Sequence, residues 1–491
     1  MEPAILTPDL AWAAPDLWLA TLRDRTAAGW LWGIEAEALL RATEERAAAL
    51  ARSGCGGTQR RILLLESEPL PFLAGFFAAV AQGCSVFLGN AQWSAAERTQ
   101  VLTWLQPDRL WENQGETILD QPPGDRASLP PTAEPWIGLP TGGTSGQIRF
   151  ALHQPRSLAA SVAGFCTYFA EDWPGPQTHS TLCTLPLCHA SGLMQVLRCF
   201  WGGGRLALAP IAQGLRLGSI GFLSLVPTQL LRLLGPETPW LQQFRVILLG
   251  GAPAWPALLD QAQAVGVRLA PTYGSTETAS QVATLRPAEF LAGARGAGQV
   301  LPHATVAIES DWAHDSLGNS STLGRVAIAG NSLAAGYLSA PGFTPLDTTA
   351  TGQFLTDDLG YFDGAQRLHL VGRASHKIIT GGENVYPAEV EAALWETGWV
   401  VDVVVLGLPD REWGQAIGAA YVPVSAMITP DQLRSALGDR LSRYKIPKRW
   451  LPLTQIPRNA QGKVDRLALA AQFRPFGSTK PVDSPARHSQ G

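Results

Sequence analysis

The chain has 491 residues, of which 46% are hydrophobic and 16% charged, and its formal net charge is −4. This length exceeds one ordinary hydrophobic core and predicts at least two domains, while the lack of a long Lys or Arg run argues against a nucleic-acid partner. Six scattered cysteines without a CxxC pair predict reduced thiols and a cytoplasmic protein rather than a disulfide framework or a zinc site.

The N-terminal residues carry Glu2 and Asp9 where a signal peptide would place positive charge, so we expect no export signal. The apolar stretch 70–89 is interrupted by a proline and a Gln-Gly pair. This favours a buried helix that runs into a strand over a membrane span.

Apolar runs that alternate with helical patterns predict an α/β fold with a parallel, helix-covered sheet. The first such unit combines a run at 61–66, a helix near 71–81 and a second run at 85–88. Further along the chain we expect helices at 94–105 and 255–264 and buried strands at 223–226 and 246–249.

The pattern changes between residues 324 and 370, where short β-like pieces predict a barrel-like or mixed-sheet subdomain. A boundary at 372–375 then separates an N-terminal domain, residues 1–373, from a small α+β domain, residues 374–475. The second domain is predicted to contain helices at 386–395 and 430–441 and strands at 400–406 and 418–424. The polar, Pro-rich residues 476–491 predict a disordered tail.

The first chemical motif is the glycine-rich stretch 141–149, TGGTSGQIR. Its glycines let the backbone approach an anion, and its hydroxyl and N–H groups can donate to phosphate oxygens. The stretch does not fit the Walker pattern, so an ordinary Gly/Ser loop is an equally good interpretation of this motif alone.

The second motif is PTYGSTE, residues 271–277. A hydroxyl beside a carboxylate at the carboxyl end of a strand can hold Mg²⁺, and a nearby aromatic ring can stack on a base. An ordinary turn with a helix cap is the simpler alternative for so short a motif.

Two further motifs lie towards the C-terminus. Thr356-Asp357-Asp358-Leu359-Gly360 is followed by Arg373, and a carboxylate beside an arginine can bind the hydroxyls of a ribose. Lys463, in the segment 457–466, can reduce the repulsion between a carboxylate and the phosphate that it attacks. The simpler alternatives are an Asp-rich turn and a solvated surface lysine.

The order of these four motifs resembles the adenylate-forming superfamily of acyl- and aryl-CoA synthetases, luciferases and adenylation domains, over nearly the whole chain. The block 355–393 is the most specific part of the resemblance. Within the superfamily, the segments 224–234, 244–254, 270–285 and 379–391 are similar to the o-succinylbenzoate:CoA ligases of menaquinone and phylloquinone synthesis, and the phosphate loop is similar to their cyanobacterial forms.

The resemblance implies that ATP, Mg²⁺ and coenzyme A are used, that the small domain moves between two half-reactions, and that Lys463, Thr276 and Glu277 are catalytic, with Glu277 holding the metal. ATP would be bound by Thr141, Gly142, Gly143, Thr144, Ser145, Gly146, Arg149, Gly250, Gly251, Ala252, Tyr273, Gly274, Asp358 and Arg373. Ser375 would be the hinge, and Gly381 and Gly382 would contact CoA.

The acid-binding residues that the resemblance implies are His189, Ser191, Gln195 and Gln281. A dicarboxylic substrate needs donors for its second carboxylate, for which Arg198 is a further candidate with a structural alternative. His189 can equally be a histidine satisfied in a buried loop, and we interpret His153 and His369 as purely structural.

The chain departs from the superfamily pattern at three places. Ile148-Arg149 stands where Pro-Lys is frequent, Asp357 replaces a common glycine, and Ser375 replaces a common acidic hinge residue. Alternatives for the function are another aryl- or acyl-CoA ligase, an adenylation enzyme that loads a carrier protein, or an inactive homologue. A homo-oligomer is compatible with the sequence.

Overall fold

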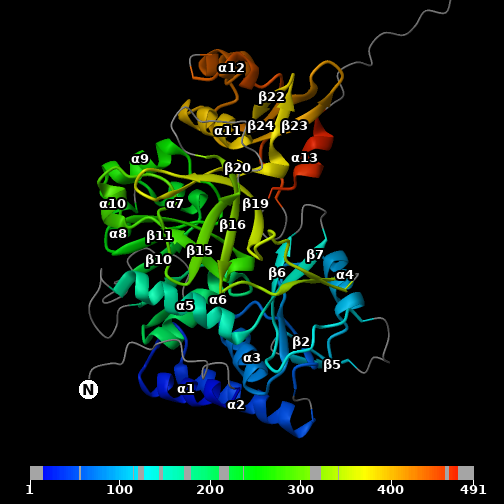
Figure 1. The fold of residues 1–491 in the computed structure, drawn as a ribbon. Helices are drawn as coiled ribbons and strands as arrows, with labels where there is room; N and C mark the ends of the chain where they lie inside the picture. The colour runs from blue at the N-terminus through cyan, green and yellow to red at the C-terminus, as the bar shows by residue number, and fades with distance from the viewer. Residues whose placement is uncertain are drawn as a thin grey trace, which may run out of the picture. The chain divides into compact units, whose positions relative to one another are not determined.

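The computed structural model describes residues 15–54, 57–113, 115–119, 126–142, 147–170, 179–208, 221–235, 237–309, 322–340, 342–438, 440–458 and 464–473. The chain forms two compact units, Met1–Ser375 and His376–Gly491. Each unit combines helices with β-sheets (Figure 1).

One eight-stranded sheet of unit 1 positions the glycine-rich hairpin. Its strand order is β18-β17-β7-β6-β3-β2-β4-β5. The core strands β6, β3, β2 and β4 are parallel, whereas β7, β17 and β18 add antiparallel strands at one side and β5 adds one at the other. The strands span Arg61–Leu65 (β2), Ser85–Leu88 (β3), Arg109–Glu112 (β4), Gly115–Ile118 (β5), Ile137–Gly142 (β6), Ile148–His153 (β7), Gly336–Ser339 (β17) and Gly342–Pro345 (β18).

A second eight-stranded sheet carries the PTYGSTE motif. Its order is β1-β9-β8-β10-β11-β12-β13-β14, parallel from β1 to β12 and antiparallel from there on. The strands span Leu31–Trp32 (β1), Thr181–Cys183 (β8), Leu206–Leu208 (β9), Phe222–Leu225 (β10), Val246–Leu249 (β11), Leu269–Ser275 (β12), Ser280–Thr284 (β13) and Gln299–Val300 (β14). The expected parallel sheet is thus confirmed for the core strands of both sheets.

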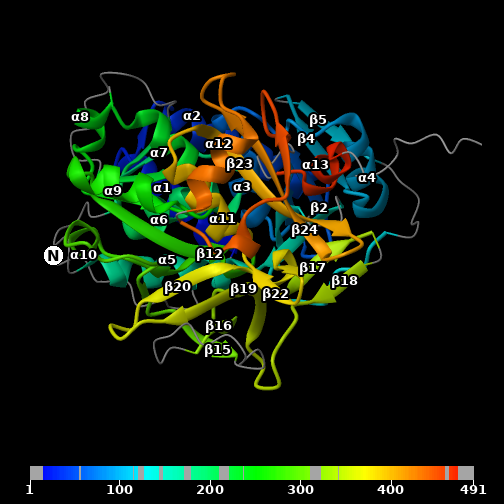
Figure 2. The same ribbon diagram turned by 90° about the horizontal axis from the view of Figure 1, so that it is seen from above.

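A four-stranded antiparallel sheet, β15-β16-β19-β20, carries the Asp358 motif. It spans Ala304–Glu309 (β15), Gly324–Gly330 (β16), Phe354–Phe362 (β19) and Leu368–Arg373 (β20). Among the described strands its two outer members, β15 and β20, do not pair with each other, so the sheet is open rather than a closed barrel. The extent that we expected for this subdomain, residues 324–370, was wrong. Strands β17 and β18 lie within that range, but β17 pairs with β7 and β18 pairs with β17 at the edge of another sheet, and Figure 2 shows them apart from β15 and β16.

The helices of unit 1 match the sequence pattern closely where it was clear. They span Pro15–Ala27 (α1), Ala36–Arg52 (α2), Pro69–Ala81 (α3), Ala95–Leu105 (α4), Pro155–Ala170 (α5), Ala190–Gly202 (α6), Pro227–Leu233 (α7), Thr238–Leu241 (α8), Pro256–Ala264 (α9) and Pro287–Leu291 (α10). Helix α4 begins with a capping box in which Ser94 and Glu97 each satisfy the other's backbone N–H. Helix α3 is buried from Pro71 onwards and leads into β3, which confirms the buried-helix interpretation.

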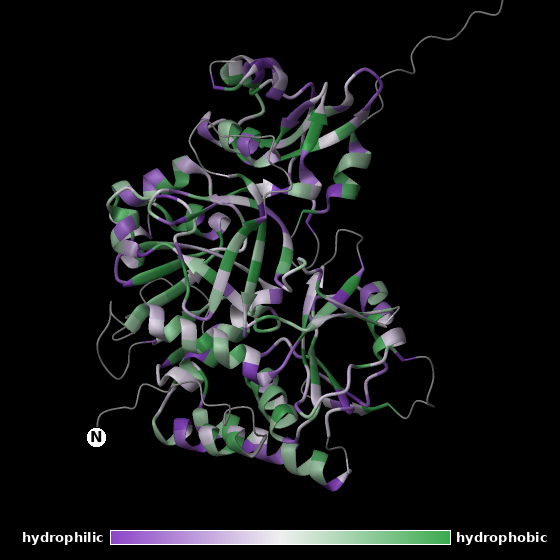
Figure 3. Ribbon diagram, in the orientation of Figure 1, coloured by the Kyte–Doolittle hydropathy of each residue, from purple (hydrophilic) through white to green (hydrophobic). Residues whose placement is uncertain are grey.

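The core of unit 1 is aromatic as well as aliphatic. Trp18, Phe76, Phe77 and Phe200 form a contiguous cluster between α1, α3 and α6. The hydropathy of the residues agrees with this arrangement. The strands of unit 1 carry mainly hydrophobic residues, whereas hydrophobic and hydrophilic residues alternate along α1 and α2 (Figure 3). Among the residues described, no helix is long and apolar enough to cross a membrane.

Unit 2 packs three helices on a five-stranded sheet. The strands span Ile378–Thr380 (β21), Glu383–Val385 (β22), Val400–Asp410 (β23), Gly414–Pro423 (β24) and Arg449–Pro452 (β25), and the helices span Pro387–Glu396 (α11), Pro430–Gly438 (α12) and Arg466–Gln472 (α13). Strands β23 and β24 are longer than predicted, because their ladder continues to the Asp410–Gly414 pair. Residues 474–491 lie outside the described part of the chain, so the expected tail stays a prediction.

Candidate active site

The end of β12 forms a tight turn that carries Thr276 and Glu277. A 3₁₀ turn, Thr276–Thr278, follows the strand directly. Ala279 and Ser280 then adopt left-handed backbone conformations, with φ of 52° and 91°. Such conformations are costly for residues other than glycine and persist only where the surroundings fix them.

Two hydrogen bonds hold the backbone of this turn. Nε2 of His153, on β7, donates to the Thr276 carbonyl oxygen at 2.8 Å, and the Ala334 N–H donates to the Glu277 carbonyl oxygen, also at 2.8 Å. Burial lowers the pKa of His153 to about 4, so the ring is neutral at physiological pH with its proton on Nε2. The unprotonated Nδ1 lies 3.0 Å from the Ser157 hydroxyl. The turn is therefore attached to the other eight-stranded sheet of unit 1.

The side chain of Glu277 is buried and only 9% exposed. The Tyr337 hydroxyl donates to its Oε1 at 2.7 Å. Burial acts to raise the pKa of this carboxyl, but the Tyr337 hydrogen bond, together with smaller contributions from Ser275, the local backbone and the positive charge of Arg149, outweighs burial and holds the pKa below its ordinary value. Glu277 is therefore a carboxylate at neutral pH, although it is buried.

The glycine-rich stretch connects β6 and β7 as a hairpin. Thr141 pairs with Arg149 and Gly142 with Ile148 across the ladder, and Thr141 is buried. Residues 143–146 lie outside the described part of the chain. The Arg149 guanidinium carbon lies 3.6 Å from the centroid of the Tyr337 ring, so the end of the hairpin adjoins the Glu277 carboxylate.

The Asp358 carboxylate joins two of the predicted motifs. The Tyr273 hydroxyl donates to Oδ2 at 2.8 Å, and Nε of Arg373 donates to Oδ1 at 3.3 Å. Asp358 and Arg373 are direct partners across the β19–β20 ladder. Burial, followed by the charge of Asp358, raises the pKa of Tyr273, so the phenol stays protonated and keeps donating.

Gly250, Gly251 and Ala252 follow the carboxyl end of β11, beside the next strand, β12. A side chain at position 250 would place its Cβ 2.5 Å from the Thr272 hydroxyl oxygen, and Gly251 has φ of 79°. Glycine at position 250 therefore lets the chain pass this close to β12, and glycine at position 251 permits the left-handed backbone conformation.

Three of the four predicted acid-binding residues lie at the start of helix α6, and the fourth contacts the helix. His189 is the N-cap of the helix, and the Ser191 carbonyl oxygen accepts a hydrogen bond from the Gln195 side chain at 2.8 Å. Gln281 Oε1 accepts one from Arg198 Nη2 at 3.1 Å. His189, Ser191 and Gln195 thus share the first two turns of α6, whereas Gln281 reaches the same helix from β13.

Arg198 is a buried cation, only 4% exposed. Its Nη2 also donates to the Ser280 hydroxyl at 3.0 Å, and its guanidinium carbon lies 4.1 Å from the centroid of Phe165. Burial lowers its pKa to about 10, so it stays charged at neutral pH. Among the described residues its Nε has no hydrogen-bond partner and no carboxylate forms an ion pair with it.

Two of the departures from the superfamily pattern meet in space. The Asp357 carboxylate accepts hydrogen bonds from both the Ser375 N–H, at 3.1 Å, and the Ser375 hydroxyl. A carboxylate from β19 therefore adjoins the residue at which unit 1 ends.

The remaining predicted residues lie in unit 2 or outside the described chain. The Gly381 N–H donates to the Trp413 carbonyl oxygen at 3.0 Å, and Gly382 follows with φ of 88°. Lys448 Nζ lies 3.4 Å from the centroid of the Trp413 ring, and the residue Trp413 is 40% exposed. Lys463 lies outside the described residues, so its position stays a prediction.

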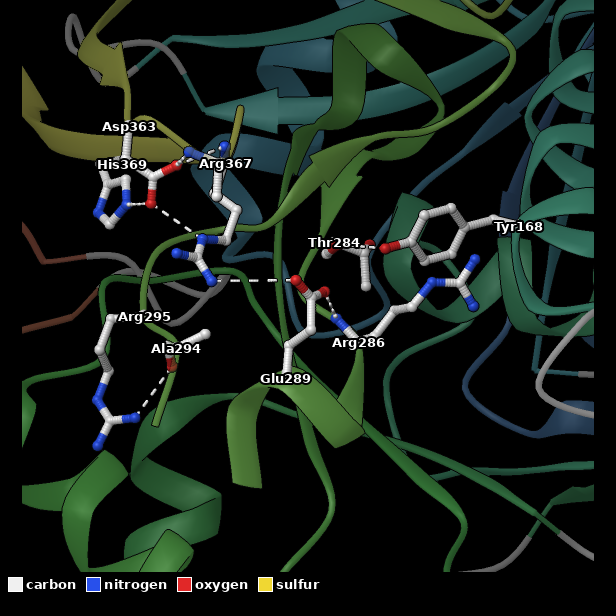
Figure 4. A network of polar contacts seen from close by, with 10 residues as sticks. Tyr168, Thr284, Arg286, Glu289, Ala294, Arg295, Asp363, Arg367 and His369 are labelled. Carbon is white, nitrogen blue, oxygen red and sulfur yellow. Dashed lines mark hydrogen bonds and ion pairs between the residues drawn. The ribbon is translucent and has the colours of Figure 1, made fainter. Parts of the chain in front are cut away.

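His369 belongs to a polar network that braces β20 (Figure 4). The Asp363 carboxylate lies 3.1 Å from His369 Nε2 and 2.9 Å from Arg367 Nε, and Arg367 forms a 4.0 Å ion pair with Glu289 of α10. This network fixes the strand that ends at Arg373, in keeping with a structural role for His369.

Sequence reasoning missed Tyr337, which contacts the Glu277 side chain. His153, interpreted as structural, is buried and holds the backbone of the turn that carries Glu277, in keeping with that interpretation.

The sequence matches two consecutive family profiles. Residues 100–338 match the family described as AMP-binding enzyme, and residues 389–463 match the AMP-binding enzyme C-terminal domain. A relative from Enterococcus faecalis, named 2-succinylbenzoate–CoA ligase, is 34% identical over 332 residues, which are 66% of this chain and 67% of the relative. The chain belongs to the AMP-binding enzyme family. Other relatives with the same name align over 60% of their own length.

Solved structures of AMP-binding enzymes share the fold. The o-succinylbenzoate CoA synthetase from Bacillus subtilis in complex with the acyl-adenylate intermediate OSB-AMP has a TM-score of 0.77 and 25% identity, covering 94% of this chain and 99% of that one. The same enzyme in complex with ATP and a magnesium ion has a TM-score of 0.72 and 25% identity, covering 88% and 93%. This agreement confirms the predicted α/β fold with a large N-terminal and a small C-terminal domain.

Proposed function

We propose that the chain is a 2-succinylbenzoate–CoA ligase of menaquinone or phylloquinone synthesis. It converts o-succinylbenzoate, ATP and coenzyme A into o-succinylbenzoyl-CoA, AMP and pyrophosphate through an acyl-adenylate. The observation that carries the proposal is the hydrogen bond between Tyr273 and Asp358, which brings together the PTYGSTE motif and the Asp358 motif from positions 85 residues apart. The names and the bound adenylate of the relatives support the choice of acid.

In this proposal ATP lies along the carboxyl ends of β11 and β12. Adenine packs against residues 250–252 and Tyr273-Gly274, where the glycines permit close approach. Asp358 and Arg373 hold the ribose, because a carboxylate accepts from both hydroxyls. The loop 141–146 with Arg149 cradles the β- and γ-phosphates, and Thr276 contacts the α-phosphate.

The residues present fit a magnesium ion. Mg²⁺ is commonly bound through one or two carboxylates and substrate phosphates, with water completing the shell. Glu277 offers an ionised carboxylate whose Oε1 is already fixed by Tyr337, and Ser275, at the end of β12, adds a hydroxyl beside it. Glu277 would hold the ion, which when bound neutralises phosphate charge.

The acid occupies the region of α6 and β13, with His189, Ser191, Gln195 and Gln281 around it. Arg198 receives the second carboxylate of the substrate, because no described carboxylate pairs with this buried cation and an anion would stabilise it. The Ser280 hydroxyl and the Gln281 amide already orient this guanidinium.

The chemistry needs positioning and charge neutralisation rather than a covalent protein nucleophile. A carboxylate oxygen of the acid attacks the α-phosphorus, and the bond to pyrophosphate breaks; Lys463 lowers the repulsion between the two anions. The CoA sulfur then attacks the mixed anhydride, AMP leaves, and the thiol proton passes to solvent. Burial raises the pKa of Cys188, beside the proposed acid site, to about 12, so this thiol stays protonated.

Residues 374–475 would act as the mobile domain, turning about Ser375 between the half-reactions. CoA would contact Gly381 and Gly382. The neighbouring Lys448 ammonium, which lies over the Trp413 ring, supports this assignment, since it offers a positive charge to the phosphates of a nucleotide. The described cysteines that form no disulfide, Cys84, Cys166, Cys183, Cys188 and Cys199, support a cytoplasmic location, and a homo-oligomer is a further proposal.

The test is to incubate the purified chain with ATP, Mg²⁺, CoA and o-succinylbenzoate, omit each in turn, and identify the products by mass spectrometry. A thioester that requires all four components is expected. A thioester formed only with other acids would identify a different aryl- or acyl-CoA ligase. Adenylate that is passed to a carrier protein but not to CoA would identify an adenylation enzyme, and no adenylate with any acid would indicate an inactive homologue.

A further inference from the structure

Three side chains from three strands or turns lie in a row beside the proposed ATP site. The Arg149 guanidinium covers the face of the Tyr337 ring at 3.6 Å, and the Tyr337 hydroxyl donates to Glu277 Oε1 at 2.7 Å. Tyr337 lies opposite Ala151 in the β7–β17 ladder. Arg149 is two residues before Ala151 on β7, so it is the diagonal neighbour of Tyr337 on the same face of the sheet.

The hydrogen bond from Tyr337 restricts the rotation of the Glu277 carboxylate. A phenol has one proton, which here is donated to Oε1. The carboxylate is therefore held in rotation through Oε1. The Ala334 N–H fixes the Glu277 carbonyl oxygen, so strand β17 and the residues just before it hold both the backbone and the side chain of Glu277.

The contact between Arg149 and Tyr337 depends on an arginine. A guanidinium is planar and can stack on an aromatic face while its edge donors stay available, whereas an ammonium is a compact point charge. Arg149 Nε is buried without a hydrogen-bond partner among the described residues. Its face thus contacts the tyrosine, and its N–H donors lie in the plane of the guanidinium.

We propose that Tyr337 is a positioning residue that aims the Glu277 carboxylate at the metal–triphosphate, and that Arg149, stacked on its ring, couples the phosphate loop to this carboxylate. The inference rests on the proposed function of the same site. It explains why Arg149 stands where lysine is frequent in the superfamily, because only arginine can stack on Tyr337 and still donate from its edge.

The test measures binding rather than turnover. Binding of Mn²⁺ together with α,β-methylene-ATP is followed by electron paramagnetic resonance, and binding of AMP without metal is followed by calorimetry. Tyr337→Phe keeps the stacked ring but loses the hydroxyl. It is expected to raise the Mn²⁺ concentration for half-saturation about tenfold, as for loss of one hydrogen bond to a charged group, and to leave AMP binding within twofold.

Two further variants make the test specific. Arg149→Lys keeps the charge but not the planar stack, and in that background the effect of Tyr337→Phe should shrink, since the two side chains act together. Tyr361→Phe is the matched control, because Tyr361 stacks on His369 in the four-stranded sheet, and it should bind Mn²⁺ like the unaltered chain.

Each outcome bears on one proposal. If the unaltered chain binds Mn²⁺ and the ATP analogue but Tyr337→Phe is unchanged, or loses AMP binding equally, the positioning role is refuted while the proposed function stands. Additive effects of Tyr337→Phe and Arg149→Lys would refute the coupling. If the unaltered chain binds neither nucleotide, the proposed function itself fails, and the positioning role fails with it.

Discussion

Arg198→Met tests how the chain chooses its acid. Methionine fills similar space without charge, so the variant removes the buried cation together with its hydrogen bonds to Ser280 and Gln281. A hydrogen bond between charged groups contributes about 1.5–3 kcal/mol, and 1.4 kcal/mol corresponds to a factor of ten. We therefore expect kcat/KM for o-succinylbenzoate to fall roughly 10- to 150-fold.

The assay compares two acids by pyrophosphate release. The first is o-succinylbenzoate, and the second is an analogue whose second, non-activated carboxylate is replaced by hydrogen. Only o-succinylbenzoate loses a charged contact in the variant. Arg198→Met should therefore reduce the ratio of kcat/KM between the two acids by nearly the full loss expected for o-succinylbenzoate. Arg198→Lys, which keeps a cation, should recover part of the preference.

The fold should tolerate the change, because none of the described carboxylates pairs with Arg198 and removing its buried charge also removes the desolvation cost. Thermal unfolding of each variant, without substrate, checks this. Equal losses of kcat/KM for both acids, with an unchanged unfolding midpoint, would refute the assignment of Arg198 to the second carboxylate.

Three other variants probe the remaining contacts. Lys463→Ala should lower adenylate formation at least 100-fold, which raises the barrier by about 2.7 kcal/mol, while thioester formation from added acyl-adenylate and CoA stays unaffected; normal pyrophosphate release would exclude the proposed role. Asp358→Asn should raise KM for ATP about tenfold by weakening ribose contacts and leave KM for the acid unchanged, as initial-rate kinetics can show. His153 has a pKa of about 4 in the folded chain against 6.5 as an ordinary value, so the unfolded chain binds more protons between these pH values and stability is lost as the pH falls from 6.5 to 4. His153→Gln, which can still donate to Thr276, should reduce this loss of stability by up to about 1.4 kcal/mol per pH unit. Denaturant unfolding at pH 7 and pH 5 measures the loss, and an equal loss in the variant and the unaltered chain would contradict the idea.

The sequence by itself determined those parts of the molecule that depend on neighbours along the chain. The position of α3 follows from a continuous apolar run that starts at a proline, and that of α4 follows from the Ser94–Glu97 capping box. The phosphate loop, the turn at Glu277 and the Asp358 motif were recognisable for the same reason, because each is a short contiguous segment whose residue types carry the chemistry.

The tertiary structure alone decided which distant segments meet. Because β17 pairs with β7, Tyr337 lies outside the subdomain expected from the sequence. It contacts Glu277, which is 60 residues away along the chain. His153 likewise reaches Thr276 across 123 residues. Strand register and side-chain direction are set by packing over the whole sheet, and they are not encoded in the local pattern of either segment.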